Sequence, residues 1–123
     1  MTNWRAVVIG FITLTVLSVF GVVLPGLGQL TAGLLGGLVA GYLAGGGLAS
    51  GAWHGLLAGS LGGIVAGVFL WVGLTIVGSV GGPVGGAIGA TGGFVLALLI
   101  VFFSLVVAAE SALAGAFGGV LGE

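Results

Sequence analysis

Side chains that could perform acid–base chemistry or bind a metal are few in this sequence. The 123 residues include one basic residue, Arg5, two acidic residues, Glu110 and Glu123, and one histidine, His54, with no cysteine. A zinc site needs about three or four convergent protein ligands, and a Ser-His-Asp triad needs an aspartate, which the chain lacks. The sequence therefore predicts no catalytic residue, no metal site, no bound cofactor and no enzymatic activity.

Glu110 is the ionisable residue with the strongest functional potential, because it follows a long apolar run. Carboxyl groups inside membrane segments are typical of ion and proton pathways, so one hypothesis is a small pore or carrier with Glu110 as its key residue. If the last span begins near Val84, Glu110 lies about 26 residues and roughly 39 Å further along, in the headgroup zone. There the carboxylate would be solvated or paired with Arg5, which is the alternative interpretation.

His54 and the hydroxyl groups of the first apolar segment have two interpretations each. His54 could act as a pH switch, but its position beside Trp53 favours an interfacial histidine next to an anchoring indole. Thr13, Thr15 and Ser18 could line a polar path. Such hydroxyl groups more often bond to the carbonyl one helical turn earlier, which favours an inert role.

The composition indicates an integral membrane protein. Hydrophobic residues make up 59% of the chain and charged residues 2%, too few to cover a globule in water. A single arginine cannot neutralise several phosphates, so nucleic acid is excluded as a partner. The lipid bilayer is the partner that the composition predicts.

The apolar segments and their breaks predict an all-α bundle of four transmembrane helices in one membrane domain, residues 1–123. The expected spans are roughly 4–24, 29–45, 53–79 and 84–109, separated by breaks at Pro25–Gly28, at Gly45–Gly47 with a loop over Leu48–Ala52, and at Gly81–Pro83. The small-residue tail 111–123 either extends the fourth helix or folds back along the interface.

Glycine recurs at every fourth position of three spans, which places a stripe without side chains along each helix. The predicted helix-packing residues are Gly33, Gly37, Gly41 and Gly45, then Gly55, Gly59, Gly63 and Gly67, then Gly85, Gly89 and Gly93. The second and third spans are expected to touch through their stripes. The continuous bulky run Phe94–Val107 is expected to face lipid, so that a leucine at Ala97 should be tolerated.

The few charges also predict a topology. Arg5 is the only residue that counts for the positive-inside rule, and it places the N-terminus in the cytoplasm of a multi-pass cell-membrane protein. Four spans return the C-terminus to the same side. Arg5, His54 and Glu110 then form one polar membrane face, on which Arg5 and Glu110 are expected to pair.

Part of the sequence resembles a known family. The stretch Gly33–Gly63, the opening Met1–Phe11 and the Leu24–Gly26 break resemble a family of small glycine-rich membrane proteins of haloarchaea. That family has no assigned function. The resemblance implies four spans in an archaeal cell membrane and carries over no catalytic or binding residue.

The functional expectation is a structural one. The glycine stripes and additional glycines at Gly36, Gly62, Gly86 and Gly92 provide more close-contact surface than one small bundle obviously uses. We therefore expect a non-enzymatic protein that forms a homo-oligomer or is an accessory subunit of a larger membrane complex. The pore or carrier built on Glu110 is the alternative.

Overall fold

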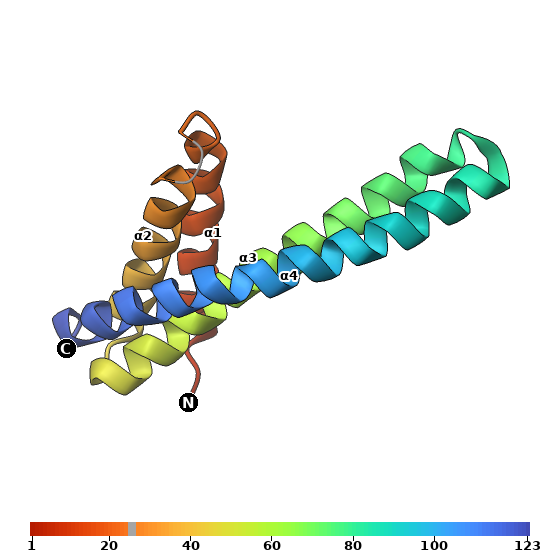
Figure 1. Cartoon of the computed structure of the whole chain (residues 1–123). Helices are drawn as coiled ribbons and strands as arrows, with labels where there is room; N and C mark the ends of the chain where they lie inside the picture. The colour runs from red at the N-terminus through yellow and green to blue at the C-terminus, as the bar shows by residue number, and fades with distance from the viewer. Residues whose placement is uncertain (25–26) are drawn as a thin grey trace. The chain divides into compact units, whose positions relative to one another are not determined.

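The computed structural model describes residues 1–24 and 27–123, and these residues form four helices and no strand (Figure 1). The helices are α1, Trp4–Gly21; α2, Leu27–Ala44; α3, Gly47–Ser79; and α4, Gly82–Leu121. Each is long and apolar enough to cross a membrane. The protein is therefore all-α, as the apolar segments predict.

The helix ends follow from local chemistry. Asn3 caps α1, because its side-chain oxygen accepts a hydrogen bond from the amide of Ala6 at 3.3 Å. The turn between α2 and α3 consists of Gly45 and Gly46, with φ of 60° and 79°, and Gly47 at the start of α3 has φ of 84°. Side-chain-bearing residues rarely adopt this region. The predicted break at Pro25 and Gly26 lies outside the described residues.

Helix α3 begins earlier than the sequence predicts. The expected loop Leu48–Ala52 is the first part of the helix, which starts directly at Gly47. Gly51 lies in this part and faces Gly119, whose Cα would be 2.8 Å from a methyl group placed on Gly51. These residues are helical because their backbone packs against α4, whereas the sequence alone shows only small residues typical of a loop.

Helix α4 continues without a break to Leu121, so the tail from residue 111 extends the helix. Gly115, Gly118 and Gly119 of this extension all contact backbone atoms of α2 or α3. With 33 and 40 residues, α3 and α4 are about 50 and 60 Å long. Both exceed the roughly 30 Å of hydrocarbon that a single perpendicular crossing requires.

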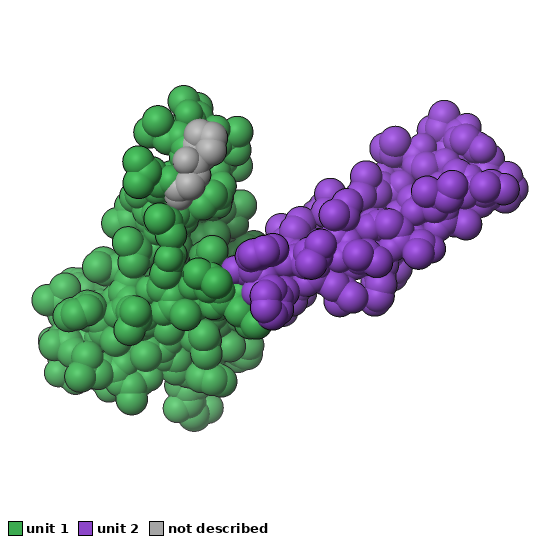
Figure 2. Space-filling view, in the orientation of Figure 1, with its two compact units in different colours: residues 1–62, 105–123 green, residues 63–104 purple. Residues whose placement is uncertain are grey.

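The chain divides into two compact units, which are coloured separately in Figure 2. Unit 1 contains Met1–Gly62 and Leu105–Glu123, and therefore includes α1, α2 and the parts of α3 and α4 nearest the chain termini. Unit 2 contains Gly63–Ser104, the remaining parts of α3 and α4.

In unit 1, α1 and α2 form an antiparallel hairpin through small residues. Gly10 of α1 faces Ala40 of α2, and Gly36 of α2 faces Leu14 of α1. A methyl group on either glycine would come within 2.6 Å of the facing Cβ atom. The two helices are therefore in direct contact along this seam.

The stripes of α2 and α3 both pack against α4. Gly37 and Gly55 face the backbone carbonyl of Ser111, and Gly41 faces that of Gly115. The sequence predicts instead that the second and third spans meet through their stripes. Their nearest neighbours are residues of α4, because Ser111, Gly115 and Gly119 continue as a small-residue row that both stripes can approach.

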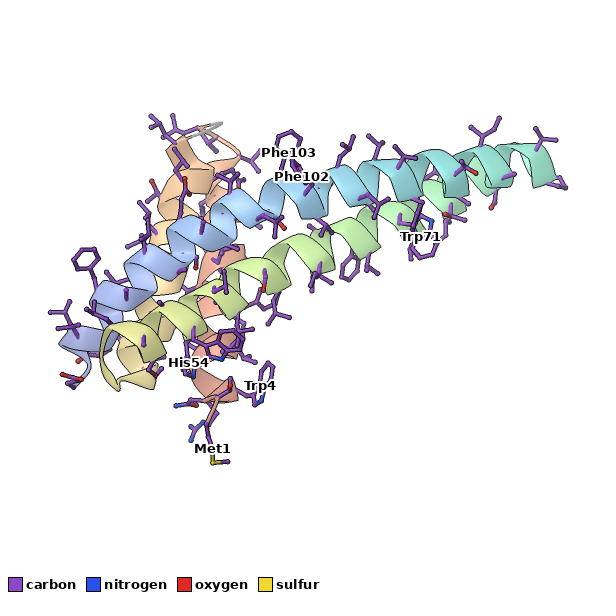
Figure 3. The ribbon with its side chains drawn as sticks, turned by 60° about the horizontal axis from the view of Figure 1, so that its bottom comes forward. Met1, Trp4, His54, Trp71, Phe102 and Phe103 are labelled. Atoms are coloured by element: carbon purple, nitrogen blue, oxygen red, sulfur yellow. The ribbon has the colours of Figure 1, made fainter. Side chains whose placement is uncertain are left out.

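In unit 2, α3 and α4 form an antiparallel pair with its own glycine seam. Gly78 faces the carbonyl of Gly85, and Gly89 faces that of Leu74. The Trp71 indole donates a hydrogen bond to the Ala90 carbonyl at 3.0 Å and meets the Phe94 ring edge-on at 5.6 Å between ring centroids (Figure 3).

The bulky run of α4 is mainly exposed, as expected of a lipid-facing surface, with one exception. Phe102 and Phe103 are about two-thirds exposed and pack edge-on against each other. Ala97 is only 9% exposed, because its backbone contacts Gly67. Ala97 is therefore not one of the lipid-facing residues of this run, and it is no longer a suitable position for a tolerated leucine.

Gly37→Leu and Gly59→Leu should each destabilise the fold, because their side chains would overlap backbone atoms of Ser111 and Ala108. We expect a loss of about 1–3 kcal/mol or more, the usual cost of overpacking. Thermal unfolding in mild detergent, followed by circular dichroism, measures the change.

Gly73→Leu is the matched control. A methyl group at this position has no atom of another helix within 4 Å among residues 1–24 and 27–123. If all three leucine variants unfold at the same temperature as the original chain, the role of the stripes in packing is refuted.

Candidate functional site

Ser111 occupies the point in unit 1 where α2, α3 and α4 converge. The residue is fully buried, and its carbonyl faces Gly37 of α2 and Gly55 of α3. Its Oγ would lie 2.5 Å from a methyl group on Gly37, and its Cβ would lie 3.0 Å from one on Gly59. Only glycines leave room for the serine here. Its Oγ is buried and has no hydrogen-bond partner.

Glu110 precedes Ser111 and also faces α2. The residue is half-buried, and its Oε2 would lie 3.7 Å from a methyl group on Gly33. Oε2 is buried without a hydrogen-bond partner, as Ser111 Oγ is. Because Gly33 and Gly37 are one helical turn apart, the two unpartnered oxygens lie along one seam between α2 and α4.

The expected ion pair between Arg5 and Glu110 is not formed among the described residues. Arg5 is exposed in the first turn of α1, whereas Oε2 of Glu110 is enclosed at the α2–α4 seam. Glu110 is also not near the end of its helix, because α4 continues for 11 residues to Leu121. The sequence argument placed it near an end by assuming a shorter span.

His54 lies against the segment that precedes α1 and is 2% exposed (Figure 3). The backbone N–H of Asn3 donates a hydrogen bond to Nε2 of His54 at 2.7 Å. Nε2 is therefore the acceptor, and the ring proton is on Nδ1. Nδ1 then donates to the Ser50 carbonyl at 2.7 Å. His54 thus joins the N-terminal segment to α3 through both of its ring nitrogens.

The neighbouring polar groups strengthen this junction. The Trp53 indole donates a hydrogen bond to the Thr2 hydroxyl at 3.1 Å, a second bond between the N-terminal segment and α3.

The threonines of α1 bond within their own helix. Thr13 and Thr15 donate to the carbonyls of Ile9 and Phe11, four residues earlier, as the inert interpretation predicts. Their hydroxyl groups are therefore engaged within α1.

The predicted helix-packing glycines lie mostly at seams within one unit. In unit 1 the neighbours of Gly33, Gly37, Gly41, Gly55 and Gly59 are residues of α4, and Gly45 lies in the turn after α2, near Gly122. In unit 2, Gly63 faces Ser104 and Gly67 faces Ala97, while Gly85, Gly89 and Gly93 face α3.

The chemical capacity of the α2–α4 seam is limited to a carboxyl group, a hydroxyl group and the backbone beside them. Within residues 1–24 and 27–123, no three His, Cys, Asp or Glu side chains form a group that could hold a metal ion. Sequence reasoning missed Ser111, although its four-residue spacing from Gly115 and Gly119 was a usable signal.

Comparison with known proteins assigns a family but no activity. The family of unknown function DUF5518 matches over residues 4–123. No curated protein and no solved structure matches the chain.

His54→Phe should loosen the N-terminal segment, because the backbone N–H of Asn3 loses its hydrogen-bond acceptor. Leaving a donor without a partner costs about 1–3 kcal/mol, so amide hydrogen exchange around Asn3 and Ala6 should accelerate about tenfold. Mass spectrometry of the N-terminal peptide measures the rate. Trp53→Phe, which removes only the bond to Thr2, should have the smaller effect, and unchanged exchange in His54→Phe would contradict the assigned hydrogen bond.

Proposed function

The chain belongs to this family of unknown function, and we propose that it is a non-enzymatic integral membrane protein whose role is structural. It associates with a second copy of itself, or serves as an accessory subunit of a larger membrane complex, through helix surfaces that its own fold leaves open. The proposal includes residence in an archaeal cell membrane with both termini in the cytoplasm, as Arg5 and the sequence resemblance suggest.

One groove in unit 2 carries this proposal. It is an open, apolar groove on the first part of α4, lined by Pro83, Val84, Ala87, Ile88, Thr91 and Gly92. The lining residues follow a four-residue spacing, so they form one helix face. Apart from its chain neighbours and the adjacent backbone of α4, no atom of the described residues lies within 4 Å of a methyl group placed on Gly92. A groove of this shape suits the side-chain ridge of another helix.

The other additional glycines contribute less to the argument. Gly36 and Gly62 face Leu14, and Gly86 faces Ser79, so each has a neighbour within its own unit. Gly92 differs because the space that a side chain would occupy at this position is open. The support for self-association therefore comes from the Gly92 groove and not from the number of glycines.

A second candidate function is a small pore or carrier with Glu110 as its key residue. The observation that favours it is the unpartnered Oε2 of Glu110, because ionisable groups within membrane helices are commonly part of ion pathways. The Thr13 and Thr15 hydroxyl groups, which are hydrogen-bonded within α1, give this candidate no additional support.

Thr91→Cys should form a disulfide-linked dimer on oxidation in native lipid, since the chain has no cysteine of its own and Thr91 lines the groove. Gly92→Leu in this background should reduce the dimer at least about fivefold by filling the groove. Gly73→Leu, at another open helical glycine, should leave it unchanged. Cross-linking at Thr91 that is insensitive to Gly92→Leu would refute association through the groove.

The carrier hypothesis predicts proton or cation flux into liposomes that contain the purified protein. Glu110→Gln should abolish that flux, whereas Glu123→Gln, at the chain end, should preserve it. A pH-sensitive dye inside the vesicles and a panel of monovalent cations outside measure the flux. Absence of flux for every cation would eliminate this candidate and leave the structural one.

A further inference from the structure

Hydrogen bonds hold His54 of α3 level with the start of α1. The backbone N–H of Asn3, the residue that caps α1, donates to the His54 ring at 2.7 Å. The indoles of Trp4 and Trp53 are half or more exposed beside this junction, and Arg5 is exposed in the first turn of α1 (Figure 3). Indole rings and an arginine at one level are typical of a membrane–water interface. The junction therefore marks one surface of the bilayer.

The turn between α3 and α4 marks the other surface. The last carbonyl groups of a helix and the first N–H groups of the next have no partner within their own helices. Val80, in this turn, is 89% exposed. Such backbone groups need water and are not tolerated where lipid tails surround them. Because α3 runs without a break to Ser79, the turn lies at the surface opposite the His54 junction.

The part of α3 between these two surfaces is longer than an ordinary bilayer is thick. Ser79 follows His54 by about 25 residues, which corresponds to about 38 Å of helix. The hydrocarbon layer of a typical bilayer is about 30 Å thick. Helix α1, with 18 residues and a length of about 27 Å, has no such excess. The excess therefore belongs to α3 and to the part of α4 that pairs with it.

The side chains near the turn do not suit a projection into water. Residues 55–109 contain no charged side chain. Ile76, Val77 and Val84 are between 64% and 73% exposed. If α3 stood perpendicular to the membrane, this apolar end would emerge into water, where a cluster of exposed aliphatic side chains is unfavourable. A tilted helix keeps the same side chains within the hydrocarbon layer.

We propose that α3, with α4 beside it, crosses the bilayer at a tilt of about 40° and that this tilt decreases as the hydrocarbon layer thickens. The cosine of the tilt is the layer thickness divided by the length of the helix between the two surfaces, here about 0.8. The α3–α4 pair thus responds to membrane thickness, and the partner that its apolar surface fits is a thick bilayer of long-chain lipids. The proposal rests on the membrane assignment of the chain, but it requires neither self-association nor ion flux.

Solid-state NMR of the full chain in oriented phosphatidylcholine bilayers measures the tilt. Valine labelled with nitrogen-15 reports on α3 at Val65, Val68, Val72 and Val77, and the directions of their N–H bonds define the helix axis. A hydrocarbon layer of about 30 Å should give a tilt of about 40°, and a layer of about 35 Å a tilt of about 20°. A tilt of 20° or less in the thinner layer, as is roughly average for membrane helices, or equal tilts in both layers, would overturn the proposal.

A pair of variants at Ile76 tests whether apolar length sets the tilt. Ile76→Asp places a short charged side chain about one turn before the end of α3 and shortens the apolar length to about 33 Å. The tilt in the layer of about 30 Å should then fall by roughly 15°. Ile76→Leu, the matched control, should retain the original tilt. Equal tilts in the two variants would contradict the proposal.

The position of the turn is tested separately by cysteine labelling, since the chain has no cysteine. Val80→Cys in the turn and Leu48→Cys at the start of α3 should react with a membrane-impermeant maleimide from opposite sides of the membrane. Val68→Cys, near the middle of the crossing, should remain unlabelled, although this residue is 51% exposed. If Val80→Cys is unreactive, or reacts from the same side as Leu48→Cys, α3 does not cross the bilayer and the proposal fails.

Discussion

The structure depends on direct contact between helix backbones at glycine positions. Around Ser111, glycines of α2 and α3 approach the same carbonyl group, and a methyl group at either glycine would overlap it. Apolar helices in lipid gain no hydrophobic energy by meeting, so their association relies on such close van der Waals contact. The same glycines would weaken a helix in water by about 1 kcal/mol each relative to alanine. In a bilayer the unpaired backbone groups of a non-helical segment would cost more, and the helices persist.

This close contact also determines where polar chemistry can occur. Because the seam lacks side chains on the α2 side, a glutamate and a serine of α4 face bare backbone and have no donor for their buried oxygens. His54 shows the opposite solution, since both of its nitrogens are engaged and its role is to fix the N-terminal segment. The two hydrogen bonds of His54 fit a structural role for the histidine.

Much of the architecture could be predicted from the sequence, because apolar length specifies the helices, glycine and proline specify the turns, and four-residue spacing specifies the stripes. The helix against which each stripe packs could not be predicted, since Gly37 and Gly55 would fit any row of small residues. Their common neighbour, Ser111, lies in a segment that the sequence allowed either to extend α4 or to leave the bundle. The burial of Ala97 was missed for a related reason: the surrounding bulky residues gave no sign that this position faces Gly67.

Solid-state NMR of the protein in liposomes, with carbon-13 introduced only at glycine, tests the backbone contacts most directly. The structure predicts inter-helix correlations between Gly41 and Gly115 and between Gly51 and Gly119, since each pair brings backbone atoms into contact. Sequence-specific assignment distinguishes them from contacts within one helix. Observation of both correlations is the expected result. Their absence in a sample whose helices are intact would contradict glycine-mediated packing as the basis of the fold.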